Sequence, residues 1–223
     1  MNRILKLLVF SDIFVITGFG LISPIMAIFI KDNLAGGSIF AAGLASTIFI
    51  ATRCILQLLF SYYGKPEYRF KMLIAGTFLI AIIPFIYSFS TTIQHIFLAQ
   101  LIYGLGAGLA NPAWFSLFAS NLSKGQQGFE WSIYSSSVGF GAAIAAYLGS
   151  ILASKIGFKP VFFIVGFLSL IGCFILISLF KKDKNKERKI KIPKRANETN
   201  KINKKIINET NKTIIPKLKP YHH

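Results

Sequence analysis

Two charged side chains, Asp12 and Arg53, lie inside long apolar stretches of this sequence. If these stretches are helices that cross a membrane, Asp12 lies about 9 Å and Arg53 about 13 Å from the same surface. Charges at such depth are costly and normally face the protein interior, where they pair. Two interpretations follow: a static salt bridge that joins the first two stretches, or side chains that bind a charged solute, with Asp12 also able to carry a coupling proton.

The fourth apolar stretch carries a polar stripe. At 100° per residue its polar and aromatic positions fall within an arc of about 80°, so they share one side of a helix. Such a stripe should face the protein interior or a water-filled cavity. It either lines a pathway or packs an interior helix whose polar groups satisfy one another. Its members are Gln100, Tyr103, Asn111 and Trp114.

Small residues and a proline accompany these polar positions. In a bilayer, helices associate through close contact across small residues, so the glycines predict tight packing. Pro112 removes a backbone donor and favours a kink. The packing candidates in the fourth and fifth stretches are Gly104, Gly108, Pro112, Gly139, Gly141 and Gly149. Gln57 lies one turn beyond Arg53 on the same face and is, with Arg53, a further pathway candidate.

The elements that must position these residues are membrane helices. The chain is 53% hydrophobic and only 15% charged, which is more apolar surface than 223 residues can bury in one soluble core. Each long apolar run can cross about 30 Å of hydrocarbon as a helix. We therefore predict an all-α polytopic membrane protein with a six-helix domain at residues 1–180, whose spans lie near 5–30, 38–62, 70–89, 95–119, 131–156 and 161–180.

Charge predicts the orientation of the spans. Lys and Arg gather near the N-terminus, the second to third loop and the fourth to fifth loop, and this places both termini in the cytoplasm. Residues 181–223 contain 15 Lys and Arg against four Asp and Glu, so most of the net charge of +17 belongs to this segment. Its polar, low-aromatic composition predicts a disordered tail drawn to anionic lipid, and no nucleic acid is expected.

Catalytic signatures are missing from the sequence. The two cysteines, Cys54 and Cys173, fall in separate apolar stretches, and we find neither a nucleophile elbow nor a phosphate loop. We expect no enzyme, no cofactor and no metal.

The motifs together resemble the N-terminal half of a major facilitator superfamily transporter over roughly residues 5–180. The resemblance rests on six spans, GFGLISPIMAIFI in the first, GLGAGLANPA in the fourth, a Gly/Ala-rich fifth and GFKPVFFIVG opening the sixth. The second to third loop keeps Gly64, Lys65 and Arg69, which the resemblance marks as gating candidates, but has no Asp before Gly64. Gln100 stands where many proton-coupled members carry arginine.

The resemblance implies that the first and fourth spans line a central cavity at the plasma membrane. It therefore favours as cavity residues Asp12, Ser23, Gln100, Tyr103, Asn111 and Trp114.

Full-length members of the family have two such halves. A symmetric homodimer would supply the second half, and a separate partner half or a relic without transport are the alternatives. We expect transport of a small solute, with a non-transporting membrane scaffold as the competing function.

Overall fold

The computed structural model describes residues 3–178 and residue 180, and these residues confirm the predicted all-α fold class. Among these described residues, six helices are long and apolar enough to cross a membrane. The elements are α1 (Arg3–Ile22), α2 (Met26–Asn33), α3 (Ile39–Tyr63), the 3-10 turn η1 (Pro66–Tyr68), α4 (Arg69–Phe89), α5 (Ile93–Ser120), α6 (Gln127–Ile156) and a sixth long helix, Phe158–Ser178. The predicted disorder of residues 181–223 lies outside the described residues, and the domain boundary at residue 180 stays a prediction.

The first span differs from the predicted single helix at residues 5–30. Helix α1 ends at Ile22 and α2 begins at Met26, with a turn between them that contains Pro24. Proline has no N–H to donate and its ring clashes with the preceding turn, so an uninterrupted helix is unfavourable at this position. The N–H groups of Ser23 and Ile25 bond to the carbonyls of Phe19 and Ile22, which keeps the turn compact.

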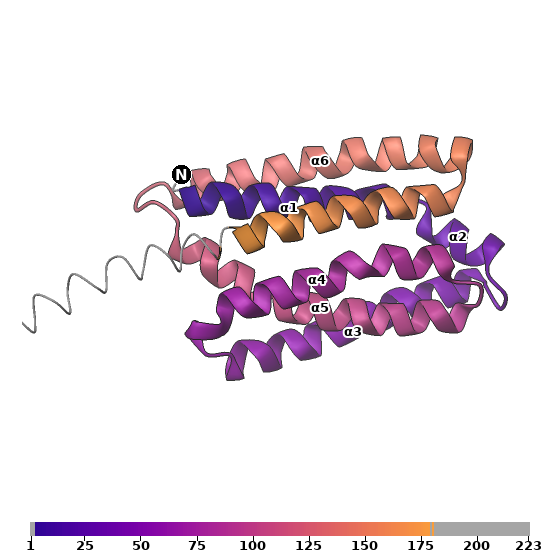
Figure 1. The fold of residues 1–223 in the computed structure, drawn as a ribbon, viewed down its shortest axis with the longest axis horizontal. Helices are drawn as coiled ribbons and strands as arrows, with labels where there is room; N and C mark the ends of the chain where they lie inside the picture. Colours follow the sequence, from indigo (N-terminus) through magenta and orange to yellow (C-terminus); the bar gives the residue numbers. More distant parts are fainter. Residues whose placement is uncertain (1–2, 179, 181–223) are drawn as a thin grey trace, which may run out of the picture. The chain divides into compact units, whose positions relative to one another are not determined.

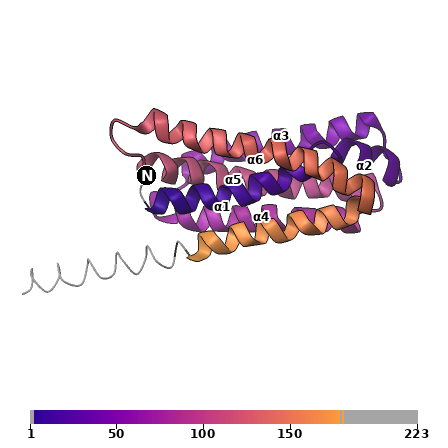
Figure 2. The ribbon, with the colours of Figure 1, turned by 90° about the horizontal axis from the view of Figure 1, so that it is seen from above.

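The long helices form two layers of three. In Figure 1, α1, α6 and the sixth long helix lie together, and α3, α4 and α5 form the other group. Seen from above in Figure 2, α1 is the middle helix of one layer and α5 the middle helix of the other. Helix α5 contacts both α3 and α4, and α1 contacts α6. The two middle helices are therefore the ones that can face each other across the bundle.

Small residues set the distances between helices. A Cβ added at Gly104 would come within 2.6 Å of the Thr52 side chain on α3, and one added at Gly76 on α4 would come within 2.5 Å of the Gly106 carbonyl. Apolar side chains gain little by leaving lipid for another helix, so close backbone contact supplies much of the association. The glycines of α5 therefore let α3 approach closely on one side of this helix and α4 on another.

Two buried apolar clusters fill the bundle. One includes Leu21, Ile83 and Phe162, and the other includes Leu8, Leu73 and Phe118. Phe19 and Tyr103 pack against both clusters.

The connections fit the sequence locally. The Ser38 hydroxyl caps α3 by accepting a hydrogen bond from the Ala41 N–H at 3.0 Å. Gly157 ends α6 with φ 86°, a conformation that glycine adopts without strain. Glu130 is buried in the first turn of α6, and its carboxylate accepts hydrogen bonds from the Ser123 N–H and hydroxyl at 2.8 and 3.0 Å. This pairing fixes the turn that joins α5 to α6.

Candidate functional site

A cavity of about 330 Å³ lies among α1, α3, α4, α5, α6 and the sixth long helix. We call it the Asp12 cavity. It is lined on several sides by apolar residues such as Val15, Leu73, Ile80 and Ala107. Its polar and ionisable lining residues come from five of these helices and include Asp12, Arg53, Thr77, Tyr103, Asn111, Trp114 and Tyr134.

Asp12 is held at one end of the cavity by an aromatic group. The Tyr134 hydroxyl on α6 donates a hydrogen bond of 2.6 Å to Asp12 Oδ2. The Tyr134 ring lies against the Trp114 indole, with centroids 4.7 Å apart, and Trp114 stacks on Phe118 at the same separation. A carboxylate among aromatic side chains attracts organic cations through charged hydrogen bonds.

Arg53 occupies the opposite end of the cavity. Its guanidinium lies 5.3 Å from the centroid of the Phe49 ring, a cation–π arrangement one helical turn away on α3. The Phe49 ring stacks on Tyr103 at 4.1 Å. The Arg53 Nε atom is buried and has no hydrogen-bond partner among the described residues. A buried donor of this kind is costly unless a ligand or water completes it.

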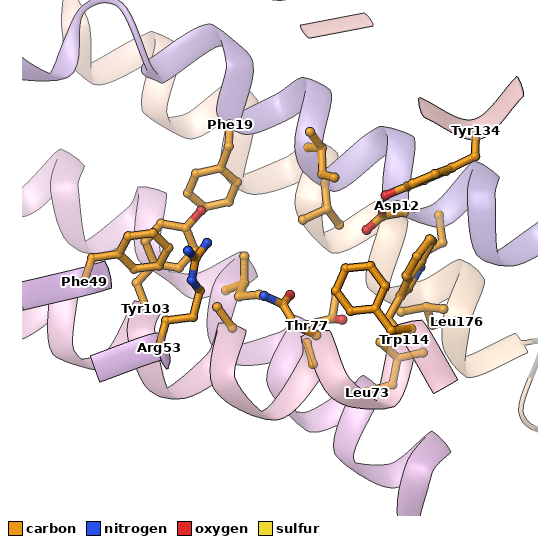
Figure 3. A pocket seen from close by; sticks show the side chains of 18 residues that line it. Asp12, Phe19, Phe49, Arg53, Leu73, Thr77, Tyr103, Trp114, Tyr134 and Leu176 are labelled. Atoms are coloured by element: carbon orange, nitrogen blue, oxygen red, sulfur yellow. Dashed lines mark hydrogen bonds between the residues drawn. The ribbon is translucent and has the colours of Figure 1, made fainter. Parts of the chain in front are cut away.

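The structure does not form the direct Asp12–Arg53 ion pair that the sequence allows. An exposed ion pair of 3.9 Å instead joins Lys31 and Asp32 on α2. Figure 3 shows Arg53 with Phe49 and Tyr103 at one side of the pocket, and Asp12 with Tyr134 and Trp114 at the other. Each charge is thus supported by its own aromatic neighbours, and the apolar middle of the cavity lies between them.

A second cavity, of about 540 Å³, borders the first. We call it the Gln100 cavity. Its lining residues are uncharged and include Ser23, Ser46, Gln100 and Tyr87. The Gln100 Oε1 atom is buried without a hydrogen-bond partner among the described residues.

A stack of three aromatic rings stands between the two cavities. Phe19, Tyr103 and Phe49 each line both of them. The Phe19 and Tyr103 rings are 4.8 Å apart and the Tyr103 and Phe49 rings 4.1 Å apart, with interplanar angles near 20°. This aromatic stack forms most of their common wall.

The structure places nearly all the predicted pathway residues around these cavities. Asp12, Arg53, Asn111 and Trp114 line the Asp12 cavity, Ser23 and Gln100 line the Gln100 cavity, and Tyr103 lines both. Gln57 is the exception: its backbone lies against Gly108, so its helix position serves the α3–α5 contact.

The predicted packing and gating residues fall into separate groups. Gly104, Gly108, Gly141 and Gly149 each leave no room for a side chain without displacing a neighbour, whereas a Cβ at Gly139 would meet open space. Helix α5 continues through Pro112. Gly64 caps the C-terminus of α3, Lys65 is exposed in the following connection and Arg69 begins α4.

Several site residues were not identified from the sequence. Four residues that line the Asp12 cavity cannot be distinguished in the sequence from the other apolar or interfacial residues of their spans. They are Phe19, Phe49, Thr77 and Tyr134. Depth in the membrane was a usable signal for Tyr134. Tyr134 lies seven residues from the start of α6 and Asp12 nine residues from the start of α1. Both helices begin at the same end of the bundle (Figure 1). Side chains at similar depth on adjacent helices can meet.

Comparison with known proteins identifies relatives of this chain. The model of the Major Facilitator Superfamily matches residues 8–218. A protein of Methanocaldococcus jannaschii described as an uncharacterized MFS-type transporter is 29% identical over 180 residues, which are 77% of this chain and 45% of that protein. The quinolone resistance protein NorA of Staphylococcus aureus is 23% identical over 188 residues, 82% of this chain and 47% of NorA. The chain thus spans about half the length of the curated relatives it matches.

Proposed function

Because the chain belongs to the major facilitator superfamily, we propose that it transports a small solute across the membrane and that the Asp12 cavity is part of the solute pathway. The observation that carries this proposal is a cavity lined by two opposite charges, Asp12 and Arg53, that do not pair with each other. A purely architectural role would be better served by a direct ion pair, because an unpaired charge inside a membrane is costly. A solute that enters the cavity can supply the missing partners of both charged groups.

A second six-helix unit would complete the pathway. Helices α3 and α6 bury only 11% and 17% of their most apolar windows, against 39–50% in the other long helices. Both helices carry residues that line the Asp12 cavity, Arg53 and Tyr134 among them. We propose that a second copy of this chain covers these faces as a homodimer, since closed two-fold pairing is the commonest association. The alternative is a separate partner half.

The distribution of Lys and Arg supports an orientation. Lys65 and Lys124 lie in connections at the bundle end where α1 begins, which is the basic end by sequence (Figure 1). The positive-inside rule assigns that end to the cytoplasm of the plasma membrane. Both termini of the six-helix unit would then be cytoplasmic.

Cysteine accessibility tests the transport proposal without knowledge of the solute. In a background with Cys54→Ser and Cys173→Ala, single cysteines would replace Asn111 in the Asp12 cavity and Ser46 in the Gln100 cavity. A membrane-impermeant methanethiosulfonate reagent would be added to right-side-out and to inside-out vesicles. Alternating access predicts that each cysteine reacts from both sides of the membrane, because rocking of paired units opens the site to each side in turn.

The control replaces Phe78, an exposed residue on α4, with cysteine, which should stay unreactive in lipid. Reaction from one side only, or from neither, would contradict transport and favour a scaffold whose polar residues pack helices. The mass of the purified protein in lipid particles shows whether one chain or two are present, and so tests the homodimer. One chain per particle would exclude the homodimer.

A further inference from the structure

The solute class can be inferred from the two ends of the Asp12 cavity. We propose that the cavity binds an amphoteric organic molecule, which has an ammonium group at one end and a carboxylate at the other. Asp12 would receive the ammonium and Arg53 the carboxylate. The inference rests on the proposed function, since it names what the pathway carries.

The Asp12 end has the properties of an ammonium site. Tyr134 donates to Oδ2 alone, and Oδ1 has no hydrogen bond among the described residues. The Trp114 and Tyr134 rings lie beside the carboxylate with centroids 4.7 Å apart. A cation there would meet a carboxylate oxygen that can accept a charged hydrogen bond from it.

The Arg53 end has the properties of a carboxylate site. A guanidinium presents a planar fork of N–H donors that matches a carboxylate, and stacking on Phe49 holds the Arg53 fork in place. The buried Nε lacks an acceptor among the described residues. An anion at this position would satisfy a donor that the protein leaves open.

The charge balance favours one molecule with both groups. Asp12 and Arg53 are the charged residues that line this cavity, and their formal charges cancel. A singly charged solute would neutralise one of them and leave the other without a counter-charge in an environment where that is costly. A molecule with both charges compensates both ends at once.

The spacing of residues along α1 indicates that the molecule is short. Asp12 and Phe19, which joins the aromatic stack beside Arg53, are seven positions apart on α1, or about 10 Å of helix rise. The apolar middle of the cavity, which includes Ile80, Ala107 and Ala110, suits one benzene ring.

Binding to three matched probes tests the inference. The probes are 4-(aminomethyl)benzoate, which carries both charges, and benzylamine and benzoate, which carry one each. The full chain in lipid nanodiscs would be titrated calorimetrically with each. We expect 4-(aminomethyl)benzoate to bind at least about tenfold more tightly than either singly charged probe, because it gains a second charged hydrogen bond.

Two variants assign the ends. Asp12→Asn should reduce binding of 4-(aminomethyl)benzoate to the level of benzoate, and Arg53→Gln should reduce it to the level of benzylamine. The matched controls are Asp32→Asn and Lys31→Gln, which neutralise the exposed pair on α2 and should leave the preference unchanged. If one cavity variant fails to fold, the other variant and the wild-type preference decide.

The inference is overturned if the unmodified chain binds benzylamine or benzoate as tightly as 4-(aminomethyl)benzoate, if it binds none of the three, or if the preference survives both cavity variants. The cysteine accessibility experiment distinguishes failure of this inference from failure of the proposed function. Alternating access without a preference for the doubly charged probe would leave transport standing and remove the amphoteric class. A preference for the doubly charged probe without cysteine access from both sides would keep the amphoteric binding site and remove transport.

Discussion

The two cavities of this protein share a wall but differ in chemistry. The Asp12 cavity presents a carboxylate and a guanidinium, whereas the residues lining the larger Gln100 cavity present hydroxyls and an amide without charge. The aromatic stack of Phe19, Tyr103 and Phe49 lies between them. Charges inside a membrane are retained where they act. We therefore expect recognition to be concentrated on the Asp12 side and the Gln100 side to serve as a neutral route.

The largest effect should come from forcing apart the helices that hold both cavities. Gly104→Leu would drive a side chain into Thr52 and displace α3, which carries Phe49 and Arg53. Overpacking of this kind should lower the free energy of unfolding by about 3 kcal/mol. Denaturant titration of the purified protein in mixed micelles measures it.

Gly43→Leu is the matched control on α3, because a Cβ at Gly43 would meet nothing within 4 Å. It should change the free energy of unfolding by no more than about 1 kcal/mol. Equal free energies of unfolding for the two variants would show that the close contact at Gly104 does not stabilise the packing of α3 against α5.

The next effect concerns the Asp12 side alone. Tyr134→Phe removes the donor of the 2.6 Å hydrogen bond and leaves the Asp12 carboxylate without its partner. Loss of a hydrogen bond to a partly buried group should cost about 2 kcal/mol. The same titration measures it, and Tyr147→Phe serves as the control on α6, since the Tyr147 side chain is 70% exposed.

A double-mutant cycle with Asp12→Asn sharpens this prediction. Asparagine keeps an oxygen that can accept the Tyr134 hydroxyl but loses the charge. The loss from Tyr134→Phe should therefore be smaller in the Asp12→Asn background. Additive effects would show that the two residues are not coupled, contrary to the geometry.

The fold could be predicted from the sequence to a large extent. An apolar run of about 20 residues is a strong one-dimensional signal, because the bilayer thickness fixes its length. The break at Pro24 was the element that this reasoning missed. Averaged hydropathy continues through Ser23 and Pro24 into MAIFI, and only the missing proline N–H indicates the turn.

The candidate site was predictable on single helices and not between them. Periodicity places Tyr103, Asn111 and Trp114 on one side of α5, because 100° per residue is a local property. The partner of Asp12 depends on how α1 and α6 are rotated against each other, which no local pattern records. The charge of Arg53 made it the expected partner, yet Tyr134 occupies that place.

A third prediction concerns the wall between the cavities. Phe49→Ala removes one ring of the aromatic stack and opens a path from one cavity to the other. We expect a cysteine at Ser46 to react about tenfold faster with a reagent added on the side where α1 begins, a change worth about 1.4 kcal/mol.

The control for this prediction is Phe40→Ala, another phenylalanine of α3, whose side chain is 79% exposed and lines neither cavity. It should leave the labelling rate of the Ser46 cysteine unchanged. If the Ser46 cysteine is labelled at the same rate with Phe49→Ala as with Phe49 unchanged, the aromatic stack does not separate the cavities.

The smallest effect should appear at Gln100. Its Oε1 atom is buried without a partner among the described residues, so the amide costs stability where it stands. Gln100→Leu keeps the volume and removes the polar group, and should raise the free energy of unfolding by up to about 1 kcal/mol. The Gln94→Leu control, at an exposed position of the same helix, should have no such effect. A stabilised variant with slower solute flux would show that Gln100 is retained for the pathway. Destabilisation by Gln100→Leu would instead assign the amide to helix packing and weaken the contrast between the two cavities.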